Sequence, residues 1–191
     1  QKQVKTYKPD FIVIGKTDLA QKLKTDLKDY QTEILVGETG LEYVSGLASH
    51  WKVSEDKQTF WFRIDPNARW ANGMPVTSHD VVATWKILTD PGILDPYSNQ
   101  LYMEYEKPEV ISKYIVKTRT KKINWRHFLY FAYSMNILPA HRLNNLTGKE
   151  YIEEYQFDML PGTGPYVLVK DKIRKGKTIV LARRNDYWAQ N

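Results

Sequence analysis

The sequence contains no cysteine, which excludes disulfides, thiolate chemistry and cysteine-based zinc sites. No run of about 18 apolar residues is present, so no segment is expected to span a membrane. The chain also lacks a charged and then apolar N-terminus with a small-residue cleavage site. We therefore expect either a cytosolic protein or an exported one whose signal segment has been removed, and the absence of cysteine suits export.

The chain contains enough apolar and aromatic residues to form a substantial core. Its 191 residues are 42% hydrophobic, which allows one large domain or two small ones. The 13 tyrosines, 6 tryptophans and 6 phenylalanines can fill a core or line a binding surface. The formal net charge of +6 favours acidic partners without identifying one.

Three patterns that suggest nucleotide or metal chemistry are incomplete. In "IVIGKTD" a strand leads into Gly15-Lys16-Thr17, but Asp10 occupies the position where a phosphate loop needs its first glycine. "GTGPY" continues into a strand, whereas a dinucleotide fingerprint opens a helix. The histidines show no metal-ligand spacing; they are His50, His79, His127 and His141. The sequence therefore predicts no catalytic residue, no metal site and no cofactor.

Two other interpretations stay open at this level. "KTRTKKINWR" places Lys117, Arg119 and Lys121 on one strand face near Trp125, and such basic and aromatic strips can bind single-stranded nucleic acid. A solvated outer strand face explains the strip better, because no RNA-binding motif accompanies it. A hydrolytic carboxylate pair could also form among the acids of the loops between residues 90 and 109, which are Asp90, Asp95, Glu104, Glu106 and Glu109.

The central segment predicts a strand, a tight turn and a capped helix. "TFWFRID" alternates, with Phe60, Phe62 and Ile64 on one face, and Asn72-Gly73 favours a reversal. Thr77 or Ser78 is expected to cap the helix, with Asp80 completing a capping-box spacing. The helix is expected to bury the face formed by Val81, Val82, Trp85 and Leu88, leaving outside it Asp80, Thr84 and Lys86.

Elsewhere the pattern alternates between helical and extended segments. A strand in "DFIVIG" precedes a helix over 17–30 with Thr17 or Asp18 as its cap, and a short strand is expected at 51–53. "DPGILDPYSNQLYMEYEKP" is expected to be loop, and "EVISKYIVKTRT" a single strand. Asn124 is expected to cap a short aromatic helix, and Thr147 and Glu150 a helix through Tyr155. "GTGPYVLVK" and "KTIVLARR" predict a closing hairpin.

Several of these motifs together resemble a known family. "GLASHWKVSEDKQTFWFRIDPNARWANGMPVTSHDVVATWKIL" is similar to the signature of extracellular solute-binding protein family 5, the peptide, dipeptide and nickel receptors of bacterial ABC importers. "LPGTGPYVLVK" and "IVLARRNDYW" resemble the family's second signature, and "DPYSNQLY" resembles the loop after its helix. The resemblance covers Gly46 to Trp188 with its motifs in the family's order.

The resemblance implies a mixed α/β (α+β) fold of the type II periplasmic-binding-protein kind, with only part of one lobe plus the small inserted domain. Residues 1–33 would form an atypical N-terminal strand and helix, residues 34–158 the inserted domain, and residues 159–191 the incomplete start of the main-lobe sheet. Residues 1–33 do not resemble the family's usual N-terminus, and family members are far longer. The chain is therefore expected to be a fragment or a shortened relative.

By the same resemblance, the chain is the substrate-binding component of an importer, or a fragment of it. It would capture a peptide or peptide-like ligand between two lobes and deliver it to the permease subunits, without catalysis. Tyr97 matches a position where some peptide-binding members place a ligand-facing tyrosine. The expected location is periplasmic or extracytoplasmic, with no nucleic-acid partner and with membrane contact only through the transporter. A hydrolase with an unrecognised active site and a basic interaction module remain the alternatives.

Overall fold

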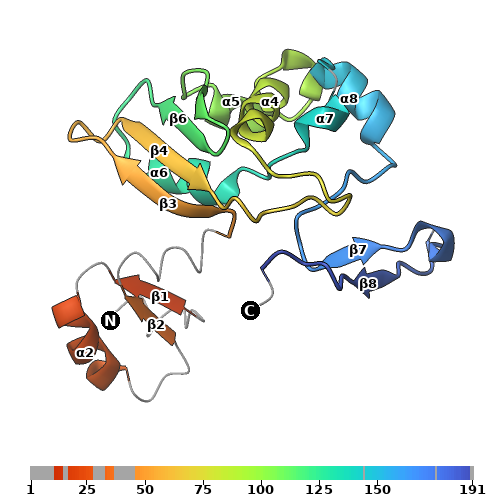
Figure 1. Cartoon of the computed structure of the whole chain (residues 1–191). Coiled ribbons are helices and arrows are strands. Elements are labelled where there is room, and N and C mark those ends of the chain that lie inside the picture. Colours follow the sequence, from red (N-terminus) through yellow and green to blue (C-terminus); the bar gives the residue numbers. More distant parts are fainter. Residues whose placement is uncertain are drawn as a thin grey trace. The chain divides into compact units, whose positions relative to one another are not determined.

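The computed structural model describes residues 11–14, 17–27, 33–36, 46–143, 145–174 and 176–189 (Figure 1). The chain divides into two compact units, Gln1–His50 and Trp51–Asn191. No helix in the described ranges is long and apolar enough to cross a membrane.

The first unit contains a strand, a helix and a second strand. β1 (Phe11–Ile14) pairs in parallel with β2 (Glu33–Val36), and α2 (Thr17–Asp26) connects them. A parallel pair needs such a crossover, because its strands run in the same direction. The predicted strand and helix are thus present. The predicted cap, Thr17 or Asp18, was wrong, because both residues already lie within the helix. Residues 28–30 of the predicted helix lie outside the described ranges.

A four-stranded sheet forms the centre of the second unit. Its strands are β3 (Ala48–Val53), β4 (Thr59–Ile64), β5 (Glu109–Ser112) and β6 (Ile115–Arg119), in the order β3-β4-β6-β5. The prediction of one strand over "EVISKYIVKTRT" was wrong, because Lys113 and Tyr114 form a turn that makes it an antiparallel hairpin. All four residues of β5 are exposed, so burial imposes no alternation that would reveal the reversal.

Helices surround this sheet. They are α4 (Ser78–Leu88), α5 (Pro96–Tyr102), α6 (Trp125–Leu129), α7 (Ala140–Leu143) and α8 (Gly148–Tyr155), with a 3-10 turn η1 (Pro91–Ile93) and a π-helix η2 (Tyr130–Ser134) that continues α6. The segment after α4 was predicted to be loop but contains η1 and α5, whose N-caps are Asp90 and Asp95. A proline at the first helical position follows each aspartate, which is a common helix start.

The last described segment is the predicted hairpin. β7 (Tyr166–Leu168) pairs antiparallel with β8 (Leu181–Arg183), and a 3-10 turn η3 (Lys170–Lys172) follows β7 (Figure 1). The predicted caps of the two preceding helices are also present. Asn124 accepts a hydrogen bond from Arg126 N, and Thr147 forms a capping box with Glu150.

Thr77, rather than Ser78, caps α4. Oδ2 of Asp80 accepts hydrogen bonds from Thr77 N at 2.6 Å and from Thr77 Oγ1 at 3.0 Å, in a capping box. The Ser78 hydroxyl instead donates to the carbonyl oxygen of Ser112 at 2.6 Å, which joins α4 to the end of β5. The predicted reversal before this cap is also present, with Gly73 at φ 82°.

The buried face of α4 differs from the prediction. Asp80 and Thr84 are buried, whereas Val82, Trp85 and Leu88 are only half-buried. The reason is the extended segment before α7, whose N–H groups need acceptors. Asp80 Oδ1 accepts from Ala140 N at 2.7 Å, and Thr84 Oγ1 accepts from Leu138 N at 2.7 Å. The remaining buried residues of the helix are Ser78, Val81 and Ile87.

Aromatic rings form the core between the sheet and the α6–η2 helix. Phe60 and Phe62 are buried as predicted, at 2% and 5% exposure. The Phe62 ring stacks on Phe128 with centroids 5.6 Å apart and on Phe131 at 5.5 Å. This stacking fixes one side of the α6–η2 helix against β4 and leaves its other side facing outward.

Candidate functional site

Tyr97 lies in the first turn of α5 and is 73% exposed. It lines an open pocket of about 390 Å³, together with neighbours from α5 and from the start of α6. The other lining residues are Gln100, Leu101, Glu104, Lys122, Ile123, Asn124, His127 and Tyr130. The tyrosine predicted to face a ligand is therefore at the rim of a pocket and is not packed into its own domain. Its ligand role stays a prediction.

A buried tyrosine supports one wall of this pocket. Tyr105 is fully buried, and its hydroxyl donates to the carbonyl oxygen of His127 at 2.7 Å. The Tyr105 ring packs against the His127 ring, with centroids 5.3 Å apart. Burial raises the pKa of Tyr105 far above its ordinary value and that of Tyr102 to about 12, so both phenols stay neutral. Tyr105 thus contacts the backbone and the ring of His127, which lines the pocket.

Polar groups at the pocket remain available to a ligand. His127 is 5% exposed, and its Nδ1 lies 3.1 Å from the Lys122 carbonyl oxygen. Because a carbonyl only accepts hydrogen bonds, Nδ1 carries a proton, and in the neutral imidazole Nε2 is then the acceptor. Nε2 has no partner among the described residues, and neither the Glu104 carboxylate nor the Lys122 ammonium forms an ion pair there. The pocket thus combines aromatic surface with an acceptor, an anion and a cation.

A buried arginine connects three of the family motifs. Arg184, at 4% exposure, connects "RWANG", "GTGPY" and "RNDYW". Its Nη2 donates to the Trp70 carbonyl at 3.3 Å, its Nη1 to the Gly164 carbonyl at 3.4 Å, and its guanidinium pairs with Asp186. Trp188 Nε1 donates to the Thr163 carbonyl at 2.9 Å. These motifs therefore hold the hairpin to the central segment.

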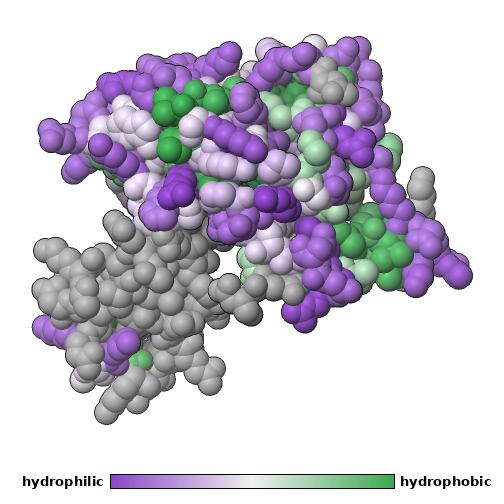
Figure 2. Space-filling view, viewed as in Figure 1, coloured by the Kyte–Doolittle hydropathy of each residue, from purple (hydrophilic) through white to green (hydrophobic). Residues whose placement is uncertain are grey.

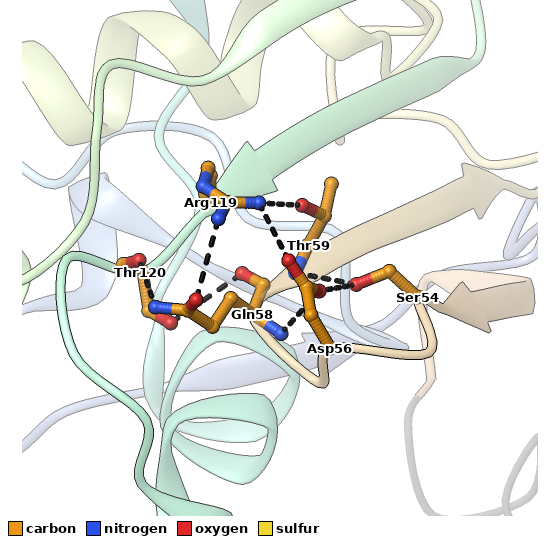
Figure 3. Close-up of polar contacts among 6 residues, drawn as sticks. All are labelled: Ser54, Asp56, Gln58, Thr59, Arg119 and Thr120. Atoms are coloured by element: carbon orange, nitrogen blue, oxygen red, sulfur yellow. Dashed lines mark hydrogen bonds and ion pairs between the residues drawn. The ribbon is translucent and has the colours of Figure 1, made fainter.

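The basic strip predicted on β6 is largely neutralised. Lys117 pairs with Glu109 at 3.0 Å and Arg119 with Asp56 at 3.0 Å. Figure 3 shows the Arg119 guanidinium bridging Asp56, Thr59 and Gln58 at the β3–β4 turn. Hydrogen bonds from Ser54 and the Gln58 N–H, together with Arg119, lower the pKa of Asp56 to about 2. Paired charges suit an outer strand face better than a nucleic-acid site, as the sequence predicted.

The described residues contain no cluster of histidine, aspartate or glutamate that could hold a metal ion. His50 and His79 are exposed, His127 is buried, and His141 Nε2 lies 2.8 Å from Asn72 Nδ2. Gly15 and Lys16, the centre of the pattern similar to a phosphate loop, lie outside the described residues. Sequence reasoning missed His127, Lys122 and Tyr130 as pocket residues, because only the packing of α5 against α6 brings them to Tyr97.

Comparison with known proteins identifies the family. Residues 42–191 match the profile described as bacterial extracellular solute-binding proteins, family 5 middle. The chain belongs to this family. It is 30% identical over 147 residues to the peptidoglycan-binding protein YepA of Agrobacterium fabrum, and 29% identical over 164 residues to the periplasmic murein peptide-binding protein MppA of Escherichia coli. These matches cover 76% and 77% of this chain but 23% and 29% of the two relatives.

A solved structure supports the fold. The oligopeptide-binding protein AppA of Bacillus subtilis, in complex with a nonapeptide, matches with a TM-score of 0.66 at 23% identity. The match covers 75% of this chain and 28% of AppA. The mixed α/β fold of the type II periplasmic-binding-protein kind, expected from the motifs, is thereby confirmed. The chain spans less than a third of the length of each of these three proteins.

Proposed function

We propose that this chain supplies one side of a peptide-binding cleft in the receptor of a bacterial ABC importer. The observation that carries the proposal is Tyr97, an exposed aromatic side chain on a pocket, in a family of solute-binding proteins. Ligand pockets characteristically combine aromatic walls with a few positioned polar groups. His127 Nε2, Glu104 and Lys122 are such groups, and they suit the amides and charged ends of a peptide.

Relatives support peptides or peptide-like solutes as the ligand class. MppA is named for murein peptides, YepA for peptidoglycan, and the AppA structure holds a nonapeptide. The protein would act as a carrier with no chemical step, outside the cytoplasm, and would pass its ligand to membrane permease subunits. Closure around the ligand is favoured only by contacts that the closed state makes and the open state lacks.

The hairpin supports a division of the chain near residue 159, where the main-lobe sheet would start. Figure 2 shows hydrophobic surface gathered over the β7–β8 hairpin. The large apolar side chains there are well exposed; they are Phe157, Met159, Tyr166, Ile179 and Leu181. An apolar patch of this kind marks a packing surface. In the proposed receptor, further strands of the main lobe cover this patch, and the second lobe closes over the Tyr97 pocket.

A thermal-shift screen of the full-length receptor against di- to nonapeptides tests the function. A ligand at about 100 times its Kd stabilises the native state by roughly 2.7 kcal/mol, so binding peptides will raise Tm. Mixed free amino acids at matched concentration serve as the control. If no peptide raises Tm while another solute class does, such as a nickel–histidine complex, the peptide assignment fails.

A further inference from the structure

The outward face of the α6–η2 helix is unusually apolar. Its inward side chains are buried, with His127 at 5% exposure and Phe131 at 5%. On the other side Trp125, Leu129 and Tyr133 follow one another at four-residue spacing, at 75%, 48% and 71% exposure. A surface helix normally places polar residues on its solvent face. This helix instead exposes three large apolar side chains in a row.

Positive charge accompanies this apolar row. Residues 110–149 contain eight lysines and arginines and no acid. Carboxylates outside this segment form ion pairs with some of these cations, including Lys117 and Arg119. Lys122 and Arg126 form no ion pair with any described residue, and both are exposed. The Arg126 guanidinium lies over the Trp125 ring, 5.1 Å from its centroid.

We propose that this interfacial face, formed by Lys122, Ile123, Trp125, Arg126, Leu129 and Tyr133, binds the surface of an anionic lipid bilayer. Exposed tryptophan and tyrosine prefer the depth of lipid headgroups, and aliphatic side chains gain by entering the acyl boundary. Ile123, at 70% exposure, supplies a further aliphatic group beside Trp125. The unpaired cations complement anionic headgroups.

The composition of the face favours lipid over nucleic acid. Single-stranded nucleic acid needs several aromatic planes free for base stacking. Of the six residues of the interfacial face only Trp125 and Tyr133 are aromatic, and Ile123 and Leu129 offer no stacking surface. The cations of the neighbouring strand are also neutralised by carboxylates. Apolar side chains between two free cations instead match the headgroup boundary of a bilayer.

This inference stands on exposure and charge alone and does not depend on a peptide ligand. A direct contact between this face and lipid goes beyond the expectation that the protein contacts the membrane only through the transporter. Lys122 and Ile123 also line the Tyr97 pocket. The interfacial face and the Tyr97 pocket therefore share an edge.

Vesicle co-sedimentation of the full-length protein tests the proposal. We expect binding to vesicles of phosphatidylcholine that contain an anionic fraction of phosphatidylglycerol, weakening as salt is raised, and little binding to pure phosphatidylcholine. Reversing both free cations in Lys122→Glu/Arg126→Glu should weaken binding at least ~20-fold, since each cation contributes roughly fivefold. Trp125→Ala should weaken binding about tenfold by removing the apolar anchor.

The matched control is Lys86→Glu/Lys107→Glu, which makes the same change in formal charge at exposed lysines outside the interfacial face. It should retain most of the binding. Three results overturn the proposal: no binding to anionic vesicles, equal loss in both double variants, or Trp125-dependent binding to single-stranded DNA but not to vesicles. Circular dichroism of each variant separates a lost contact from a lost fold.

Discussion

Asp80→Ala is expected to lower the free energy of unfolding by about 3 kcal/mol, which is large for one substitution. The Asp80 carboxylate is 3% exposed and accepts hydrogen bonds from Thr77 N and from Ala140 N. Alanine leaves these N–H groups without an acceptor in a buried position, so their desolvation is no longer compensated. The N-terminal contact of α4 and the anchoring of the chain before α7 are lost together.

Urea denaturation followed by circular dichroism measures this loss. Glu150→Ala is the matched control, because Glu150 completes the other capping box of the chain on an exposed helix end. Its loss should be clearly smaller than that of Asp80→Ala. Equal losses in the two variants would mean that the Ala140 contact contributes nothing, and that Asp80 acts only as a cap.

Arg184→Ala is expected to cost about 3 kcal/mol and to loosen the β7–β8 hairpin. The buried guanidinium satisfies the carbonyl oxygens of Trp70 and Gly164 and pairs with Asp186. Removing it empties a buried position and takes away the contacts to the Gly164 and Trp70 carbonyls, although Trp70 O still accepts from the Gly73 N–H. Arg184→Lys keeps the charge but loses the planar fork, so it should recover only part of the stability.

Arg183→Ala provides the control for this prediction, since Arg183 is the exposed neighbour in β8. Its effect should stay within about 0.5 kcal/mol, as is usual for surface positions. Hydrogen exchange of the β7 and β8 amides gives the local readout, and it should accelerate only in the Arg184 variants. Unchanged protection in Arg184→Ala would show that the hairpin is held by other contacts.

Local signals in the sequence predicted much of the second unit. The alternation around Phe62 located β4, Asn72-Gly73 the reversal, and Thr77 with Asp80 the start of α4. These features depend on residues close together in the chain, so their physical causes are visible in a short window. The family motifs then predicted the fold class correctly.

The wrong prediction of the buried face of α4 has its cause in long-range contacts. Asp80 and Thr84 are polar, so periodicity placed them outside, but the backbone N–H groups of Ala140 and Leu138 draw them inward. The α5 helix was missed because two prolines suggested loop, although proline at a first helical position is compatible with a helix. His127 joined the Tyr97 pocket only through packing across the fold.

Titration calorimetry on Tyr97 variants of the full-length receptor tests the central proposal most directly. With a peptide that raises Tm, Tyr97→Ala should weaken binding about tenfold, because truncating an aromatic contact commonly costs more than 1 kcal/mol. Tyr97→Phe should retain most of the affinity. Tyr133→Ala is the control, since Tyr133 is 71% exposed, much like Tyr97 at 73%, but does not line the pocket. Equal affinity of the wild type and Tyr97→Ala would contradict the account and place the peptide elsewhere.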